Sequence, residues 1–137
     1  MITLLDTGPL VALLDVRDQH HDWATTELGC LPGPFVTCEA VIAETSQLLI
    51  AHSTAFWRVL AMMRDGSLEV AQHLPKESLP LENLLRRYAP RMDFADACMV
   101  RLSELHPQAR LATLDSDFSF YRRHGRERIP LLAPFAK

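Results

Sequence analysis

The chain of 137 residues is predicted to be an α/β protein, a three-layer α/β/α sandwich around a parallel sheet of roughly five strands. Short apolar runs alternate with amphipathic helical patterns, which favours parallel strands joined by helical crossovers. Two of the runs, Ile2–Leu5 and Leu111–Leu114, lead directly into an aspartate. The length and the 48% hydrophobic composition fit a single domain spanning residues 1–137.

The first stretch predicts a buried strand, a tight turn and a helix. Ile2–Leu5 is the strand, and Pro9 stands in the first turn of a helix whose apolar positions run to Leu14. Asp6 therefore ends a strand just before a helix N-terminus, at the sheet edge where open α/β proteins bind ligands. The alternative is that Asp6 or Thr7 only caps the helix.

The later elements are each bounded by glycine, proline or a polar cluster. Helices are predicted over 22–28, 38–51, 53–64, 76–88, 93–105 and 118–123, and strands over 35–37, 67–71, 110–114 and 128–132. Thr37 is the predicted N-cap of the second of these helices. Gly66 and Pro107 end two others, and Pro130 places the last strand at a sheet edge.

Acidic residues follow two of the predicted strands. Asp115 ends one strand as Asp6 ends another, and Asp117 comes two residues later. The carboxyl ends of parallel strands meet at one edge of a sheet. If the two strands are neighbours, Asp6 and Asp115 lie close together.

Two further acids interrupt helical patterns. Glu44 shares a helix face with Val41 and Leu48, and Asp96 lies within an apolar segment one turn after Asp93. A carboxylate on a buried face is costly unless it is paired or bound to a cation. For either residue, an arginine partner is the alternative to a metal.

Converging carboxylates repel one another unless a cation lies among them. Oxygen-only ligands select Mg²⁺ or Mn²⁺ rather than zinc. Such ions activate water and stabilise the leaving oxygen of a phosphodiester. The acids therefore predict metal-dependent phosphoryl chemistry.

Charge is unevenly distributed along the chain. The net charge is −3, yet the acids outside the predicted site are outnumbered by the 14 Lys and Arg residues. An acidic centre with basic flanks suits a polyanionic substrate. The candidates for RNA contact are Arg86, Arg87, Arg91, Arg122 and Arg123, and solvated arginines at helix ends are the alternative.

The ordered motifs resemble the PIN domain, most closely the ribonuclease toxins of VapC-type toxin–antitoxin systems. The resemblance rests on Asp6-Thr7, Glu44, the run Met92-Asp93-Phe94-Ala95-Asp96-Ala97 and the run Thr113-Leu114-Asp115-Ser116-Asp117-Phe118, and it covers essentially the whole chain. It implies a five-stranded parallel sheet, Mg²⁺ or Mn²⁺, endonucleolytic cleavage of RNA, dimerisation and inhibition by a small antitoxin.

The resemblance also implies roles for individual residues. The acidic quartet would be Asp6, Glu44, Asp96 and Asp115, with Asp6, Asp96, Asp115 and Asp117 as metal ligands. Thr7 and Asp93 are accessory candidates, and Asp93 could exchange roles with Asp96 if the helix register differs by a turn.

Other function classes share some of these residues. The run Asp6-Thr7-Gly8 also occurs in retroviral-type aspartic proteases, but those need an all-β chain. A PIN-like module that binds RNA or protein without cleaving is the main alternative. With no membrane-length apolar run and no signal-peptide pattern, a cytoplasmic protein is expected.

Two further expectations concern packing. Cys30, Cys38 and Cys98 lack zinc-like spacing and are expected to be buried free thiols. The helix over 53–64 carries apolar residues around most of its circumference, so it is either fully buried or partly at a dimer interface.

Overall fold

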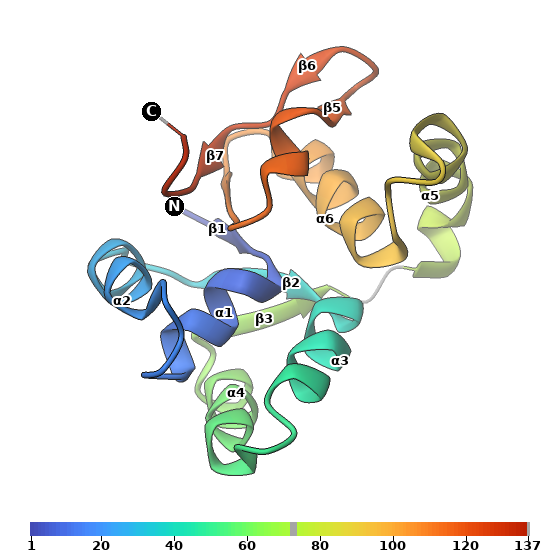
Figure 1. The fold of residues 1–137 in the computed structure, drawn as a ribbon. Helices are drawn as coiled ribbons and strands as arrows, with labels where there is room; N and C mark the ends of the chain where they lie inside the picture. The colour runs from blue at the N-terminus through green and yellow to red at the C-terminus, as the bar shows by residue number, and fades with distance from the viewer. Residues whose placement is uncertain (72–73, 137) are drawn as a thin grey trace.

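The computed structural model describes residues 1–71 and 74–136. Strands and helices alternate along the first two thirds of the chain, and short strands follow (Figure 1). In chain order the elements are β1 (Thr3–Leu5), α1 (Thr7–Leu14), α2 (His21–Gly29), β2 (Phe35–Cys38), α3 (Glu39–Leu48), α4 (Ser53–Asp65), β3 (Leu68–Ala71), α5 (Leu74–Tyr88), α6 (Phe94–Leu105), β4 (Arg110–Ala112), the 3₁₀ helix η1 (Ser116–Ser119), β5 (Arg122–Arg123), β6 (Glu127–Arg128) and β7 (Leu131–Leu132).

The main sheet confirms the predicted fold class. Its five strands are parallel and run in the order β3-β2-β1-β4-β7, so β1 is central and β7 forms an edge, as Pro130 predicts. β1 pairs with β4 through Leu4 opposite Leu111 and Leu5 opposite Ala112. The strands that precede Asp6 and Asp115 are therefore neighbours.

Helices cover both faces of the sheet. Figure 1 shows α1, α2 and α4 on one face and α6 on the other, with α5 outside α6. α3 packs against both α1 and α6 at the carboxyl end of β2. The core lies between these layers, where Leu4, Leu111 and Met99 are fully buried. None of the helices in the described part of the chain has the length and apolar character needed to cross a bilayer.

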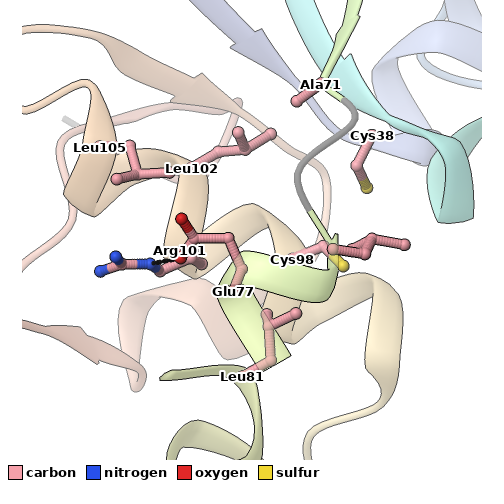
Figure 2. A pocket seen from close by; sticks show the side chains of 9 residues that line it. Cys38, Ala71, Glu77, Leu81, Cys98, Arg101, Leu102 and Leu105 are labelled. Atoms are coloured by element: carbon pink, nitrogen blue, oxygen red, sulfur yellow. Dashed lines mark hydrogen bonds and ion pairs between the residues drawn. The ribbon is translucent and has the colours of Figure 1, made fainter. Parts of the chain in front are cut away.

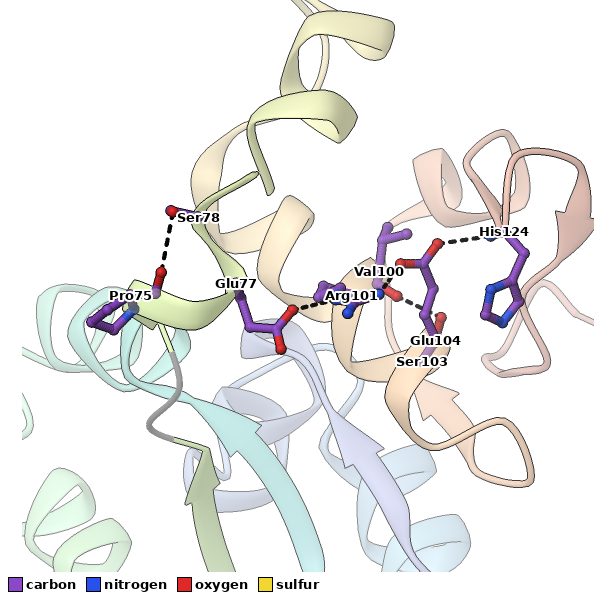
Figure 3. Close-up of polar contacts among 8 residues, drawn as sticks. All are labelled: Pro75, Glu77, Ser78, Val100, Arg101, Ser103, Glu104 and His124. Atoms are coloured by element: carbon purple, nitrogen blue, oxygen red, sulfur yellow. Dashed lines mark hydrogen bonds and ion pairs between the residues drawn. The ribbon is translucent and has the colours of Figure 1, made fainter. Parts of the chain in front are cut away.

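Helix α6 is held from its solvent side as well as from the sheet. Arg101 donates to Glu77 of α5 and to Glu104 Oε1, and Glu104 Oε2 accepts the His124 N–H at 2.7 Å (Figure 3). Beneath these ion pairs an apolar cavity of about 40 Å³ separates α5, α6 and the ends of β2 and β3 (Figure 2). α6 therefore has a fixed orientation, and with it the acids of its first turn.

Several boundaries differ from prediction for local reasons. α1 begins at Thr7 and holds Pro9 in its first turn, as predicted, whereas α3 ends at Leu48 rather than residue 51. Thr37 does not cap α3, because its hydroxyl donates to the Leu5 carbonyl across the sheet at 2.7 Å; Cys38 occupies the N-cap position. Gly66 ends α4 in the left-handed conformation at φ 85°, as a glycine C-cap does.

The helix predicted over 118–123 is wrong. Residues 116–119 form one short 3₁₀ turn, and Arg122–Arg123 pair antiparallel with Glu127–Arg128 as a separate two-stranded hairpin. The strand predicted over 128–132 is correspondingly reduced to Leu131–Leu132. This hairpin was not predicted, because its pairing depends on contacts with α6.

Two packing expectations are resolved. Cys38 and Cys98 are buried free thiols that line the cavity of Figure 2, whereas Cys30 is exposed, contrary to prediction. On α4 only Val59 is buried, while Trp57 is 60% exposed and Met63 39% exposed. The fully buried alternative for α4 is therefore excluded.

Candidate active site

All the predicted acids lie around one cleft at the carboxyl edge of the sheet. The cleft has a volume of about 450 Å³, and its lining includes Asp6, Thr7, Glu44, Arg91, Asp93, Asp96, Asp115 and Asp117. These residues come from four places: the end of β1, α3, the segment that opens α6, and the segment after β4. The structure thus brings together residues separated by up to 111 positions in the sequence.

Asp6 stands at the N-cap position of α1, yet its side chain makes no capping hydrogen bond. Instead, Asp6 Oδ2 accepts a hydrogen bond from Thr113 Oγ1 at 2.8 Å. Burial raises the pKa of Asp6 to about 6, and the nearby charges of Asp115 and Glu44 add to this rise against the hydrogen bonds from Thr113 and Thr7. The simple capping alternative for Asp6 is therefore not met.

Thr113 also organises the segment that carries Asp115. Its Oγ1 accepts the Asp115 N–H at 3.0 Å while donating to Asp6, so one hydroxyl links the two strand ends. Asp115 Oδ1 then accepts the Asp117 N–H at 2.9 Å and caps η1. These hydrogen bonds thus fix the positions of Asp6, Asp115 and Asp117 relative to one another.

Asp93 and Asp96 make different contacts. Asp93 is the N-cap of α6, and its Oδ1 accepts the Asp96 N–H at 2.8 Å. Asp96 Oδ2 accepts the Tyr121 hydroxyl at 2.9 Å, and in the described part of the chain no arginine forms an ion pair with it. The arginine-partner alternative for Asp96 is therefore not met.

Asp96 is only partly exposed and lies among like charges. Burial raises its pKa to about 7, and the charges of Asp93, Asp6 and Asp115 push in the same direction against the hydrogen bond from Tyr121. A carboxyl pKa this far above its ordinary value is typical of functional sites.

Glu44 occupies a different environment from the one predicted. Val41 is buried, but Leu48 is 61% exposed and Glu44 is exposed too, so the three do not form a buried stripe. The buried positions of α3 are Val41 and Thr45. Glu44 therefore projects from the rim of the cleft, where it pays little desolvation cost.

The donor set fits Mg²⁺ or Mn²⁺. The cleft offers carboxylates, and Thr7 Oγ1 is a buried polar atom without a hydrogen-bond partner among the described residues. Across residues 1–71 and 74–136, no group of three His, Cys, Asp or Glu side chains is arranged to hold a metal ion by itself. Mg²⁺ often keeps several of its waters in proteins, so an open acidic cleft can hold it without a closed set of protein ligands.

The predicted arginines divide into two groups. Arg91 lines the cleft: its Nε is 4.0 Å from Asp117 Oδ1, and its guanidinium lies 4.3 Å from the centroid of the Phe120 ring. Arg87 lies over Tyr88, and the exposed Arg86 pairs with Glu82 within α5. All three of these positively charged side chains are exposed at the surface.

Arg122 and Arg123 instead serve the fold. Arg123 is 4% exposed and donates to the carbonyls of Ser103 and Pro107, so an RNA contact is incompatible with its burial. Arg122 Nη1 donates to three carbonyls of the segment just before it, starting with Ser119 at 2.8 Å. These bonds anchor the hairpin to η1 and to the end of α6.

Two hydroxyl groups that hold the acids were not assigned roles from the sequence. Thr113 carries a weak signal, because it lies two residues before Asp115 in the segment that follows β4. Tyr121 has none, since it meets Asp96 only through the fold.

Comparisons with known proteins bear on the fold. No protein-family model and no curated protein sequence matches the chain. Among solved structures, VapC20 of Mycobacterium tuberculosis, described as a toxin that cleaves the sarcin-ricin loop, matches with a TM-score of 0.75 and 23% identity over 88% of this chain and 94% of that one. A toxin–antitoxin complex from Klebsiella pneumoniae matches with a TM-score of 0.68 and 17% identity over 98% and 99%. The chain therefore has the fold of a VapC-type toxin, the PIN-like fold that its sequence motifs predict.

Proposed function

We propose that this protein is a metal-dependent endoribonuclease and the toxin of a toxin–antitoxin pair. The observation that carries the proposal is the convergence of Asp6, Glu44, Asp96 and Asp115 on one cleft. The pKa values of Asp6 and Asp96 are raised by burial and by neighbouring carboxylates. Such a cluster is costly without a cation, so its presence favours function over stability.

The side chains of the cleft have different proposed roles. Asp6, Asp96, Asp115 and Asp117 would hold Mg²⁺ or Mn²⁺, which when bound stabilises charge on the phosphodiester and acidifies water. Glu44, exposed at the rim, accepts the proton of the attacking water. The Thr7 hydroxyl, which has no hydrogen-bond partner among residues 1–71 and 74–136, would hold a water or a substrate oxygen.

RNA cleavage itself tests the proposal. The purified protein should cut single-stranded or structured RNA in millimolar Mg²⁺ or Mn²⁺, and EDTA should stop the reaction because the acids then have no cation to coordinate. The measurement is the appearance of discrete cleavage products on a denaturing gel. Undiminished cleavage in EDTA would contradict the metal dependence, and intact RNA under all conditions would favour a silent PIN-like binding module.

Arginines near the cleft are proposed to contact phosphates. Arg91 lines the cleft, and Arg87 is an exposed arginine in the last turn of α5. Replacing either with alanine should weaken RNA binding for all sequences and reduce the slope of log affinity against log salt by about 0.7–0.9 per lost contact. Fluorescence anisotropy at several salt concentrations measures this slope.

A matched control is Arg64→Ala in the last turn of α4, outside the cleft lining. It should leave the salt slope unchanged. Equal slopes for the wild type, Arg87→Ala and Arg91→Ala would mean that these arginines are only solvated surface.

The proposal includes two protein partners in the cytoplasm. The structural neighbour from Klebsiella pneumoniae is described as a toxin–antitoxin complex, which supports a small antitoxin as one partner. The exposed apolar residues Trp57, Leu60 and Met63 of α4 support a second copy of the chain as the other.

A further inference from the structure

We propose that Tyr121 is a positioning residue for the acidic site: its hydroxyl holds one oxygen of Asp96, so that the other oxygen faces the cleft. This inference rests on the proposed metal-dependent function. It assigns a role to a residue outside the acidic motifs, on a segment that the sequence predicts as a helix.

The contact is specific to one carboxylate oxygen. Tyr121 Oη donates to Asp96 Oδ2 at 2.9 Å, and the Asp96 backbone N–H is already held by Asp93 Oδ1 at 2.8 Å. Asp96 is thus fixed at its backbone and at one side-chain oxygen. Oδ1 has no hydrogen-bond donor within residues 1–71 and 74–136, and Asp96 lines the cleft.

The tyrosine ring cannot move easily. Tyr121 is fully buried, and the rings of Tyr88 and Phe118 meet it edge-on with centroid distances of 5.1 and 5.3 Å. Its backbone N–H donates to the Asp117 carbonyl at 3.0 Å. Tyr121 therefore ties Asp96 on α6 to the η1 segment that carries Asp115 and Asp117.

The hydrogen bond from Tyr121 to Asp96 opposes the electrostatic repulsion between Asp96 and its neighbouring carboxylates. Asp96 lies near the like charges of Asp6 and Asp115, which would turn a free carboxylate away from them. Hydrogen bonds to a ligand's far oxygen keep it oriented, and their loss typically costs 10–100-fold in metal affinity or activity. Thr113 holds Asp6 Oδ2 in the same manner.

The competing explanation is that the hydroxyl merely satisfies a buried polar group. Tyr88 provides the matched control, because it lies in the same aromatic cluster and its hydroxyl accepts the Arg122 N–H at 2.9 Å, away from the acids. Removing either hydroxyl deletes one part-buried hydrogen bond. Only removal of the Tyr121 hydroxyl should affect a cation in the cleft.

The experiment compares Tyr121→Phe and Tyr88→Phe with the wild type by calorimetric titration of Mn²⁺, with melting in EDTA measured in parallel. Tyr121→Phe should weaken Mn²⁺ binding about 10-fold or more and lower kcat for RNA with KM changed less than about twofold. Tyr88→Phe should keep the Mn²⁺ affinity of the wild type even if its melting temperature falls. In an Asp96→Asn background, Tyr121→Phe should cause no further loss of Mn²⁺ binding, because the two act as a unit.

Equal Mn²⁺ affinity for Tyr121→Phe and the wild type would overturn the inference and leave the proposed function standing. Equal weakening in both tyrosine variants would overturn it in favour of a purely structural role. If Tyr121→Phe does not fold, Tyr121→Met, whose flexible side chain fills space without donating, replaces it in the same comparison. A wild type that neither binds Mn²⁺ nor cleaves RNA would instead overturn the proposed function, and with it this inference.

Discussion

Asp6→Asn is expected to reduce RNA cleavage by about 10²-fold or more while leaving the fold intact. Asparagine can still accept the hydrogen bond from Thr113, so the link between the ends of β1 and β4 survives. What is lost is the negative charge that a divalent ion and its transition-state charge require. Single-turnover cleavage rates at saturating Mg²⁺ measure the effect.

The control for this variant is Glu69→Gln. Glu69 is an exposed acid on the edge strand β3 and does not line the cleft. Its replacement should leave the rate within about twofold of the wild type, as for surface substitutions generally. If Asp6→Asn cleaves as fast as Glu69→Gln, Asp6 is not part of the reaction.

Asp96→Asn should remove most of the stabilisation that Mn²⁺ confers. At a hundredfold excess over Kd, a ligand stabilises the folded state by about 2.7 kcal/mol, which for a domain of this size raises the melting temperature on the order of 5–15 °C. The variant should lose most of this rise, while its melting temperature in EDTA should equal or exceed that of the wild type because one repelling charge is gone. Thermal melts of both proteins in EDTA and in Mn²⁺ give the comparison.

Asp93→Asn is the matched control, since asparagine remains a good N-cap for α6. It should retain the larger share of the Mn²⁺ response. An Asp96→Asn protein that melts far lower in EDTA yet keeps the wild-type response to Mn²⁺ would show that Asp96 is structural. Asp93 would then be the first candidate to replace it.

The same variant carries a pH signature. The pKa of Asp96 is raised from 3.8 to about 7 in the folded protein, so the folded state holds this proton more tightly than the unfolded chain does. In the metal-free wild type, the folded state is stabilised because it binds this proton more tightly. This stabilisation is complete below about pH 4 and is lost as the pH rises through about 7. Asp96→Asn should decline less over this interval.

The fold could be predicted because its central elements obey local rules. β1 and α6 are buried with patterns that fit one secondary structure only, and prolines or glycines mark many of the ends. The region after Asp117 does not obey such rules. Arg123 is buried and donates hydrogen bonds to the carbonyls of Ser103 and Pro107. The sequence of residues 118–128 gives no sign of these partners.

Within the candidate site, too, some residues could be predicted from the sequence and others could not. Asp6, Asp96 and Asp115 were predictable because each ends a strand run or interrupts an apolar helical pattern, whereas Glu44 lines the cleft without lying on the buried stripe that the sequence suggested. The groups that orient the acids were not predictable, since Tyr121 reaches Asp96 across 25 positions of sequence and Thr113 reaches Asp6 across 107. The sequence motifs identify the acidic residues of the site, whereas the residues that orient them are found only in the folded structure.

The pairing of β1 with β4 also determines which changes of length the gene can tolerate. Asp6 and Thr113 face each other because Leu5 lies opposite Ala112, and side chains alternate between the two faces along a strand. Deleting one codon within β4 would turn Thr113 and Asp115 towards the wrong layer, a defect that no single compensating substitution repairs. The turn at residues 124–126 is exposed and lies outside the main sheet, so a change of length there leaves the pairing of the two central strands intact.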